Sequence, residues 1–210
     1  MAFARRALLL ALPLAAADWI ATTTADLASA EKLQGQLRER FGSRIDGVHS
    51  VAIRSYYWWE EKVRQEDEVR TLLDSDVPFA ELREAVEALH PYEVPMIVTT
   101  AHGGPLIAKK DNLDRHVMGS VDINGTTAEE AGTIAEELVR VRYVACAQVE
   151  KLDDRADDHR VTVKTTGASK VHIVREFGGL EFEWTPLQGN RPYMEWLEKS
   201  VQNNDGGSEL

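Results

Sequence analysis

Apolar residues in the first half of the chain recur with two periods, one helical and one typical of strands. Over 27–41 they return at steps of three and four residues, as on the buried face of a helix, with Asp26 placed to cap it and Gly42 to end it. A second helical face ends at His90 and consists of Phe79, Leu82, Val86 and Leu89. Strands are predicted by the runs at 19–24, 48–59, 63–73 and 94–100. The resulting order, strand-helix-strand-strand-helix-strand, is that of a split βαβ unit.

The second half shows part of the same pattern. A strand is predicted at 117–123, followed by a helix in which Thr126 is the cap and Glu129 closes a capping box. A further strand is predicted at 143–149. The segment between Thr165 and Leu180 is too short for a complete second helix of this unit.

The predicted fold class is therefore α+β, with two tandem ferredoxin-like units whose antiparallel sheets carry helices on one face. Turn residues and polar residues between the two halves indicate a linker. The expected organisation is a leader at 1–17, a first unit at 18–104, a linker at 105–116, a second, diverged unit at 117–202 and a loose tail at 203–210.

Charge and composition exclude several classes of protein. The formal net charge of −11 argues against a nucleic-acid surface, because phosphate binding needs clustered Lys and Arg. The single cysteine excludes an intrachain disulfide, and no apolar run reaches the ~20 residues of an ordinary transmembrane helix, so no membrane partner is expected. No nucleophile elbow, phosphate-binding glycine loop or HExxH motif occurs, which predicts that the protein is not an enzyme.

The N-terminus has the pattern of a cleavable targeting segment. Arg5 and Arg6 precede a short Leu-rich run and then an alanine triplet that fits a cleavage site. This pattern indicates export or delivery to an organelle. The alternative is that the run forms the first strand of the domain and that the protein is cytoplasmic.

Two motifs resemble the CutA divalent-cation-tolerance family. The hexapeptide HPYEVP at 90–95 resembles the hallmark turn of that family, and SYYWWE at 55–60 resembles its aromatic hairpin, at the right spacing. In the second half, 128–149 resembles the family's first helix and cysteine-bearing strand, and 160–165 resembles its third strand. The segment 186–197, with Tyr193, Trp196 and Leu197, resembles its C-terminal strand and helix. Most family members have glycine where Glu61 stands, which predicts a wider hairpin here.

The resemblance implies a non-enzymatic protein of divalent-cation tolerance that takes part in the response to metal ions. Its proposed copper-binding groups correspond to Cys146 in the second half and His90 in the first, and thiolate and imidazole suit a soft or borderline metal. His49 and Glu93 are further candidate ligands for Cu(II) or another divalent cation, weakly bound. Because neither half carries both a cysteine strand and HPYEVP, a site would need groups from both halves or from two subunits. The structural alternatives are a small buried cysteine and a histidine that serves the turn.

The resemblance also implies assembly, since CutA proteins form trimers in which sheet edges of neighbouring subunits pair. The aromatic run at 56–59 places large rings on both faces of its strand, which predicts packing against a neighbour. We therefore expect a trimer-like homo-oligomer. The alternative function is a structural or signalling oligomer that resembles the PII proteins and binds a small anion or a partner protein at inter-subunit clefts.

Overall fold

The structure is a computed structural model that describes residues 18–100, 118–152, 158–176 and 181–201. The expected leader, the linker and the loose tail lie outside these described residues. Within them, no helix combines the length and the apolar character that crossing a membrane requires.

Four strands and two helices of the first half appear in the predicted order. They are β1 Asp18–Thr24, α1 Leu27–Phe41, β2 Ile45–Trp59, β3 Lys62–Ser75, α2 Phe79–Leu89 and β4 Ile97–Thr100, with a short 3-10 turn at Gly42–Arg44. The Asp26 side chain accepts a hydrogen bond from the Ser29 amide, and Gly42 ends α1 with a φ of 61°, so both predicted helix signals are confirmed. The strands lie side by side in the order β4-β1-β3-β2.

The second half repeats this order of elements. They are β5 Met118–Thr126, α3 Ala128–Arg140, β6 Cys146–Lys151, β7 His159–Thr166, α4 Gly167–Glu176, β8 Glu181–Gly189 and a final helix, α5 Arg191–Ser200. Its strands lie in the order β8-β5-β7-β6, which matches the first half strand for strand. Helix α4 corrects the expectation that this half lacks a full second helix. The cap of α3 is Thr127 with Glu130, one residue later than predicted.

The strands of both halves belong to one closed sheet of eight strands, β1-β3-β2-β6-β7-β5-β8-β4. The separate sheets expected from the sequence are joined at two seams, one where β2 pairs with β6 and one where β4 pairs with β8. Each described strand therefore has a partner on both sides. Unpaired edges, one reason for expecting an oligomer, are consequently absent from the part of the chain that the structure describes.

The hairpin between β2 and β3 is tight rather than wide. Trp59 pairs with Lys62, and the two residues between them, Glu60 and Glu61, have φ values of 48° and 62°. A two-residue turn of this kind needs a positive φ at both positions, which explains why glycine suits the second one. The hairpin thus keeps its shape without the glycine, at the cost of local strain.

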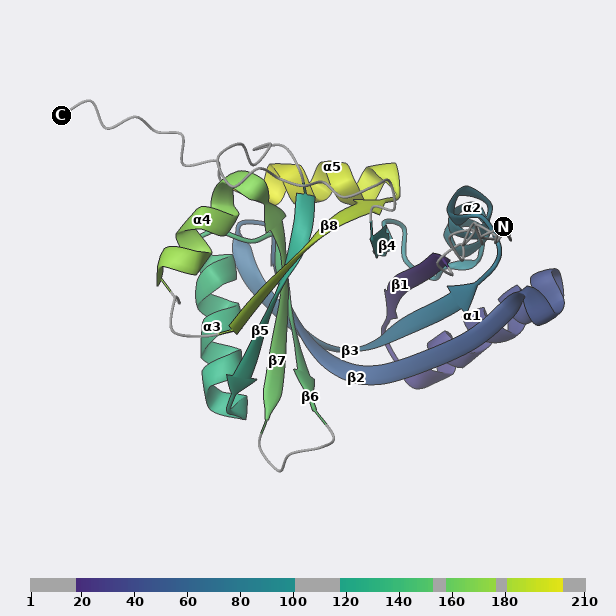
Figure 1. Ribbon diagram of the computed structural model, residues 1–210, viewed down its shortest axis with the longest axis horizontal. Helices are drawn as coiled ribbons and strands as arrows, with labels where there is room; N and C mark the ends of the chain where they lie inside the picture. Colours follow the sequence, from purple (N-terminus) through teal and green to yellow (C-terminus); the bar gives the residue numbers. More distant parts are fainter. Residues whose placement is uncertain (1–17, 101–117, 153–157, 177–180, 202–210) are drawn as a thin grey trace, which may run out of the picture.

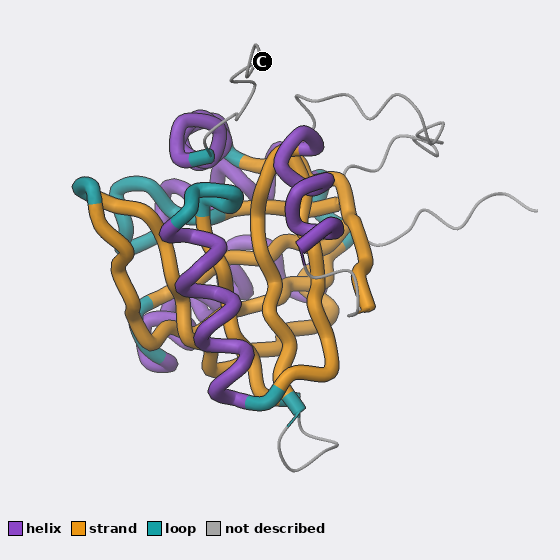
Figure 2. Tube along the Cα trace, turned by 90° about the vertical axis from the view of Figure 1, so that its left-hand side faces the viewer, coloured by secondary structure: helices purple, strands orange, loops and turns teal. Residues whose placement is uncertain are grey.

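Helices cover the outside of the closed sheet. Figure 1 shows α1 and α2 beyond the strands of the first half, α3 and α4 on the opposite side and α5 across one end; Figure 2 shows the helices of the second half in front of its strands. Adjacent residues of β1 point to opposite sides: Ile20 belongs to the core under α1 and α2, and Ala21 to a cluster inside the sheet. That inner cluster also holds Met96, Tyr193 and Leu197 from elements far apart in sequence.

The β2–β6 seam ties the two halves together with apolar and charged contacts. Tyr56 of β2 is buried in the core that α3 forms with the strands of the second half. Arg70 of β3 makes an ion pair with Glu150 of β6, and each side chain is only 11% exposed. Because these contacts cross from one half to the other, we expect the halves to unfold together.

Candidate functional site: a cavity shared by the two halves

A cavity of about 520 Å³ lies between the two halves of the chain. The first half contributes the aromatic hairpin of β2 and β3, the end of β1 and the segment of the HPYEVP turn that leads into β4. The second half contributes Cys146 and Gln148 of β6 together with Tyr193 and Trp196 of α5. Tyr57 and Cys146 are direct partners across the β2–β6 seam, so this seam brings the two halves' contributions together.

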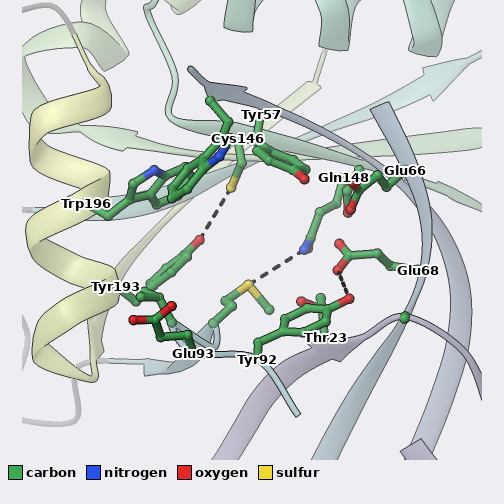
Figure 3. A pocket seen from close by; sticks show the side chains of 15 residues that line it. Thr23, Tyr57, Glu66, Glu68, Tyr92, Glu93, Cys146, Gln148, Tyr193 and Trp196 are labelled. Atoms are coloured by element: carbon green, nitrogen blue, oxygen red, sulfur yellow. Dashed lines mark hydrogen bonds between the residues drawn. The ribbon is translucent and has the colours of Figure 1, made fainter. Parts of the chain in front are cut away.

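The inner wall of the cavity combines sulfur and phenol groups. The Cys146 Sγ lies 3.4 Å from the Tyr193 hydroxyl (Figure 3), and both residues are buried. The Gln148 Nε2 donates to the Met96 Sδ at 3.6 Å, an uncommon partner for an amide. Burial raises the pKa of the Cys146 thiol, and the Lys164 ammonium partly opposes this effect. The thiol is therefore protonated near neutral pH and behaves as a weak ligand until a metal displaces its proton.

Lys164 is buried next to the inner wall but does not line the cavity. It pairs with Cys146 across β6 and β7, and its Nζ donates to the Gln148 Oε1 at 2.9 Å. Desolvation lowers the pKa of this ammonium. The amide of Gln148 thus connects a buried cation on one side with the Met96 thioether on the other.

The opposite wall is acidic. The Tyr92 hydroxyl donates to the Glu68 Oε1 at 3.1 Å, and Figure 3 shows Glu66 and Glu68 side by side on this wall. Burial, together with the neighbouring Glu66 carboxylate, raises the pKa of Tyr57 to about 12. Burial and Glu68 likewise raise the pKa of Tyr92. Both phenols remain neutral donors, and the potential here disfavours any further negative charge.

His90 does not line this cavity. Its Nδ1 accepts a hydrogen bond from the Tyr92 amide at 3.1 Å, which leaves Nε2 as the protonated nitrogen, 3.2 Å from the Thr22 Oγ1. Its ring meets the Tyr92 ring edge to face, with centroids 5.2 Å apart. Burial lowers the pKa of His90, so the ring is neutral at physiological pH. In this arrangement the imidazole fixes the turn that presents Tyr92 and Glu93 to the cavity.

The other predicted ligands lie apart from one another. Glu93 lines the cavity with Cys146, whereas His49 is an exposed residue of β2 paired with Leu72 and does not line it. In the described ranges, no group of three or more His, Cys, Asp or Glu side chains is arranged to hold a metal ion. The structure thus brings together one thiol and one carboxylate of the four predicted ligands. Donors of these two kinds fit a weakly held cation rather than a closed structural metal site.

Sequence reasoning missed several residues of the cavity. Gln148 follows Cys146 by two positions in a strand, so the two side chains share one face of the sheet. The strand period alone could therefore have placed Gln148 beside Cys146. Tyr193 and Trp196 are three positions apart in α5, which places both rings on one side of the helix. Met96 had no signal of its own, because a methionine at the start of an apolar strand is ordinary core.

Comparisons with known proteins identify the family. The family model described as CutA1 divalent ion tolerance protein matches residues 19–104. The divalent-cation tolerance protein CutA of Thermococcus kodakarensis is 39% identical over 77 residues, which are 36% of this chain and 72% of that protein. The chain belongs to the CutA family.

Other CutA proteins are also similar to part of the chain. The CutA of Pyrococcus horikoshii is 38% identical over 79 residues, which are 37% of this chain and 74% of that protein. Among solved structures, the periplasmic divalent cation tolerance protein CutA of Archaeoglobus fulgidus is 28% identical, with a TM-score of 0.37, over 44% of this chain and 89% of that one. The CutA family model ends at residue 104. The likeness of the second half to a CutA unit is therefore supported only by its own sequence resemblance and by its strand order.

Proposed function

We propose that this chain is a fusion of two CutA-type ferredoxin-like units, at 18–104 and 117–202, and that it acts in divalent-cation tolerance without catalysis. The repeated strand orders, β4-β1-β3-β2 and β8-β5-β7-β6, support the fusion. The named function of the CutA relatives supports the role in tolerance. In this account, segment 105–116 links the units, and residues 1–17 are a leader.

The proposed activity is weak binding of copper or another divalent cation in the shared cavity. One observation carries it: Cys146 from the second unit and Glu93 from the HPYEVP turn of the first line the same cavity, with the Met96 thioether beside them. Sulfur donors favour copper over hard cations such as magnesium. His90 contributes indirectly by fixing the turn that carries Glu93.

Titration with Cu(II) under anaerobic conditions tests this proposal. Replacing Cys146 with alanine removes the central donor and is expected to weaken binding by at least about tenfold, as loss of even an indirect metal contact does. A His49→Ala variant is the matched control and should bind like the wild type, because that imidazole is exposed and outside the cavity. Equal affinity in the wild type and in a variant that lacks both His90 and Cys146 would contradict the proposal.

The same titration has an expected pH dependence. The metal must displace the thiol proton, and burial raises the pKa of Cys146, so the proton competes strongly at neutral pH. Affinity is expected to increase as the pH rises through neutrality and above. The Cys146→Ala variant should lose this part of the pH dependence. An unchanged pH profile in that variant would assign the binding to other groups.

The PII-like alternative has one observation in its favour. A second cavity, of about 220 Å³, is lined by Arg70, Arg160 and Lys164, which suit a small anion, although Asp122 also lines it. Whether a divalent cation or a nucleotide-like anion raises the melting temperature separates the two functions. Self-association into a trimer-like oligomer also remains a proposal, and it would use outer surfaces rather than strand edges.

A further inference from the structure

The walls of the shared cavity carry far more aromatic surface than a metal ion needs. Five rings line it, from Tyr57, Trp59, Tyr92, Tyr193 and Trp196. The Tyr193 and Trp196 rings are tilted against each other with centroids 5.4 Å apart, and Trp59 stands 47% exposed. The volume of about 520 Å³ falls within the range of small-molecule sites. Rings set around a space of this size are suited to a ligand that presents a cation to their faces.

The charges around the cavity have one sign. Glu66, Glu68 and Glu93 line it, and among the described residues no lysine or arginine does. Throughout the described part of the chain, none of these three carboxylates forms an ion pair with a basic side chain, whereas Arg54, Arg64 and Arg70 of the same hairpin pair with other acids. The buried Lys164 does not line the cavity, and its ammonium donates to the Gln148 side chain. The cavity therefore presents negative charge that no basic side chain of the described ranges compensates by an ion pair.

A buried hydroxyl on the cavity wall provides a second, independent observation. Ser55 lines the cavity and is 3% exposed, yet its Oγ has no hydrogen-bond partner among the described residues. Buried hydroxyls without a partner are rare, since leaving one unsatisfied costs about 1–3 kcal/mol. A ligand with a hydroxyl or an N–H group next to its cationic centre would satisfy Ser55.

We propose that the shared cavity binds a small organic cation, an alkylammonium with a short polar arm. The ammonium lies among the aromatic rings and is balanced by Glu68 and Glu66, and the polar arm reaches Ser55. This proposal goes beyond metal binding and does not depend on it, because it uses the rings and carboxylates rather than the Cys146 thiol. The acidic wall excludes anionic ligands of the same size.

The first test compares two ligands of equal shape on the wild-type chain. Choline serves as the cationic probe and 3,3-dimethylbutan-1-ol as its uncharged isostere, both titrated by calorimetry with a chelator present so that no metal takes part. Choline is expected to bind about tenfold or more tightly than the alcohol, since a cation over aromatic faces gains what a neutral group does not. Equal binding of the two ligands, or no binding of choline, would overturn the proposal.

The second test removes a charge at matched positions of one strand. Glu68→Gln takes one charge from the cavity wall and is expected to weaken choline binding about tenfold, as loss of a partly buried carboxylate near a cation does. Asp67→Asn takes the same charge from the neighbouring position, which pairs with Arg54 and does not line the cavity, and should leave choline binding within about twofold.

A third variant tests the aromatic rings. Trp59→Leu changes an exposed position, so it should not disturb folding, and it is expected to weaken choline binding severalfold. Equal effects of Glu68→Gln and Asp67→Asn, or no effect of Trp59→Leu, would overturn the assignment of this cavity.

Discussion

Replacing Glu150 with alanine is expected to destabilise the protein by about 3–5 kcal/mol, because the change leaves the buried Arg70 guanidinium without its partner. The two side chains form an ion pair across the halves, and each is only 11% exposed. The Arg70 Nε already has no hydrogen-bond partner among the described residues, so little else can compensate the charge. Chemical denaturation followed by circular dichroism measures the loss.

Two controls separate this effect from loss of contact area. Asp67→Ala breaks an ion pair with Arg54 whose side chains are 51% and 76% exposed, and it is expected to cost less than about 1 kcal/mol. A double variant with leucine at both Arg70 and Glu150 should lose less than Glu150→Ala alone, because no buried charge remains unpaired. A double variant as unstable as the single one would contradict the burial argument.

Truncating Tyr56 to alanine is expected to cost about 3–5 kcal/mol in the free energy of unfolding, the usual range for a large buried ring. Tyr56 belongs to β2 of the first half but is 5% exposed within the core of the second half. The whole described chain should therefore lose stability in one transition, seen as a single shifted melting curve by calorimetry.

Trp59 is the matched control for this change. It lies on the same strand, is 47% exposed, and its replacement with alanine should cost less than about 1 kcal/mol. A Tyr56→Ala variant in which one half melts early while the other keeps its wild-type transition would show that the halves are independent. That result would contradict the packing across the β2–β6 seam.

Local sequence patterns predicted the elements of the first half well, because helix caps and apolar periods depend only on residues close together in the sequence. Asp26 and Gly42 bound α1 at the residues where cap chemistry places them. In the second half, the segment between Thr165 and Leu180 was interpreted as too short for a full second helix, whereas it forms α4, and Ile173 of this helix is fully buried in the core. The Thr166 Oγ accepts a hydrogen bond from the Ser169 amide at the start of this helix, a cap signal that could have been read from the sequence.

The candidate site could be predicted only in its parts. The resemblance to CutA proteins pointed to Cys146 and His90, with Glu93 as a further candidate ligand. Cys146 and Glu93 line the cavity, whereas His90 does not. No local pattern says that β2 pairs with β6, because strand partners distant in sequence depend on the whole fold. The rings on both faces of β2 were interpreted as contacts with another subunit, whereas in the structure β2 pairs with β6 and Tyr56 packs into the core of the other half of the same chain. His90 was predicted to be a metal ligand because of its imidazole. Its two hydrogen bonds, with the Tyr92 amide and the Thr22 hydroxyl, show that both ring nitrogens instead hold the turn in place.

A single chain closes the sheet and thereby builds the cavity from both halves. Arg54 of β2 lies directly opposite Val149 of β6, and neither side chain is fully buried. With cysteine at both positions, mild oxidation followed by mass spectrometry and non-reducing electrophoresis tests the claim most directly, with each single substitution, which leaves one introduced cysteine beside the buried Cys146, as control. The account predicts a disulfide within one chain and a product of monomer mass. Disulfide-linked dimers or larger products, formed in place of the intrachain bond, would contradict it.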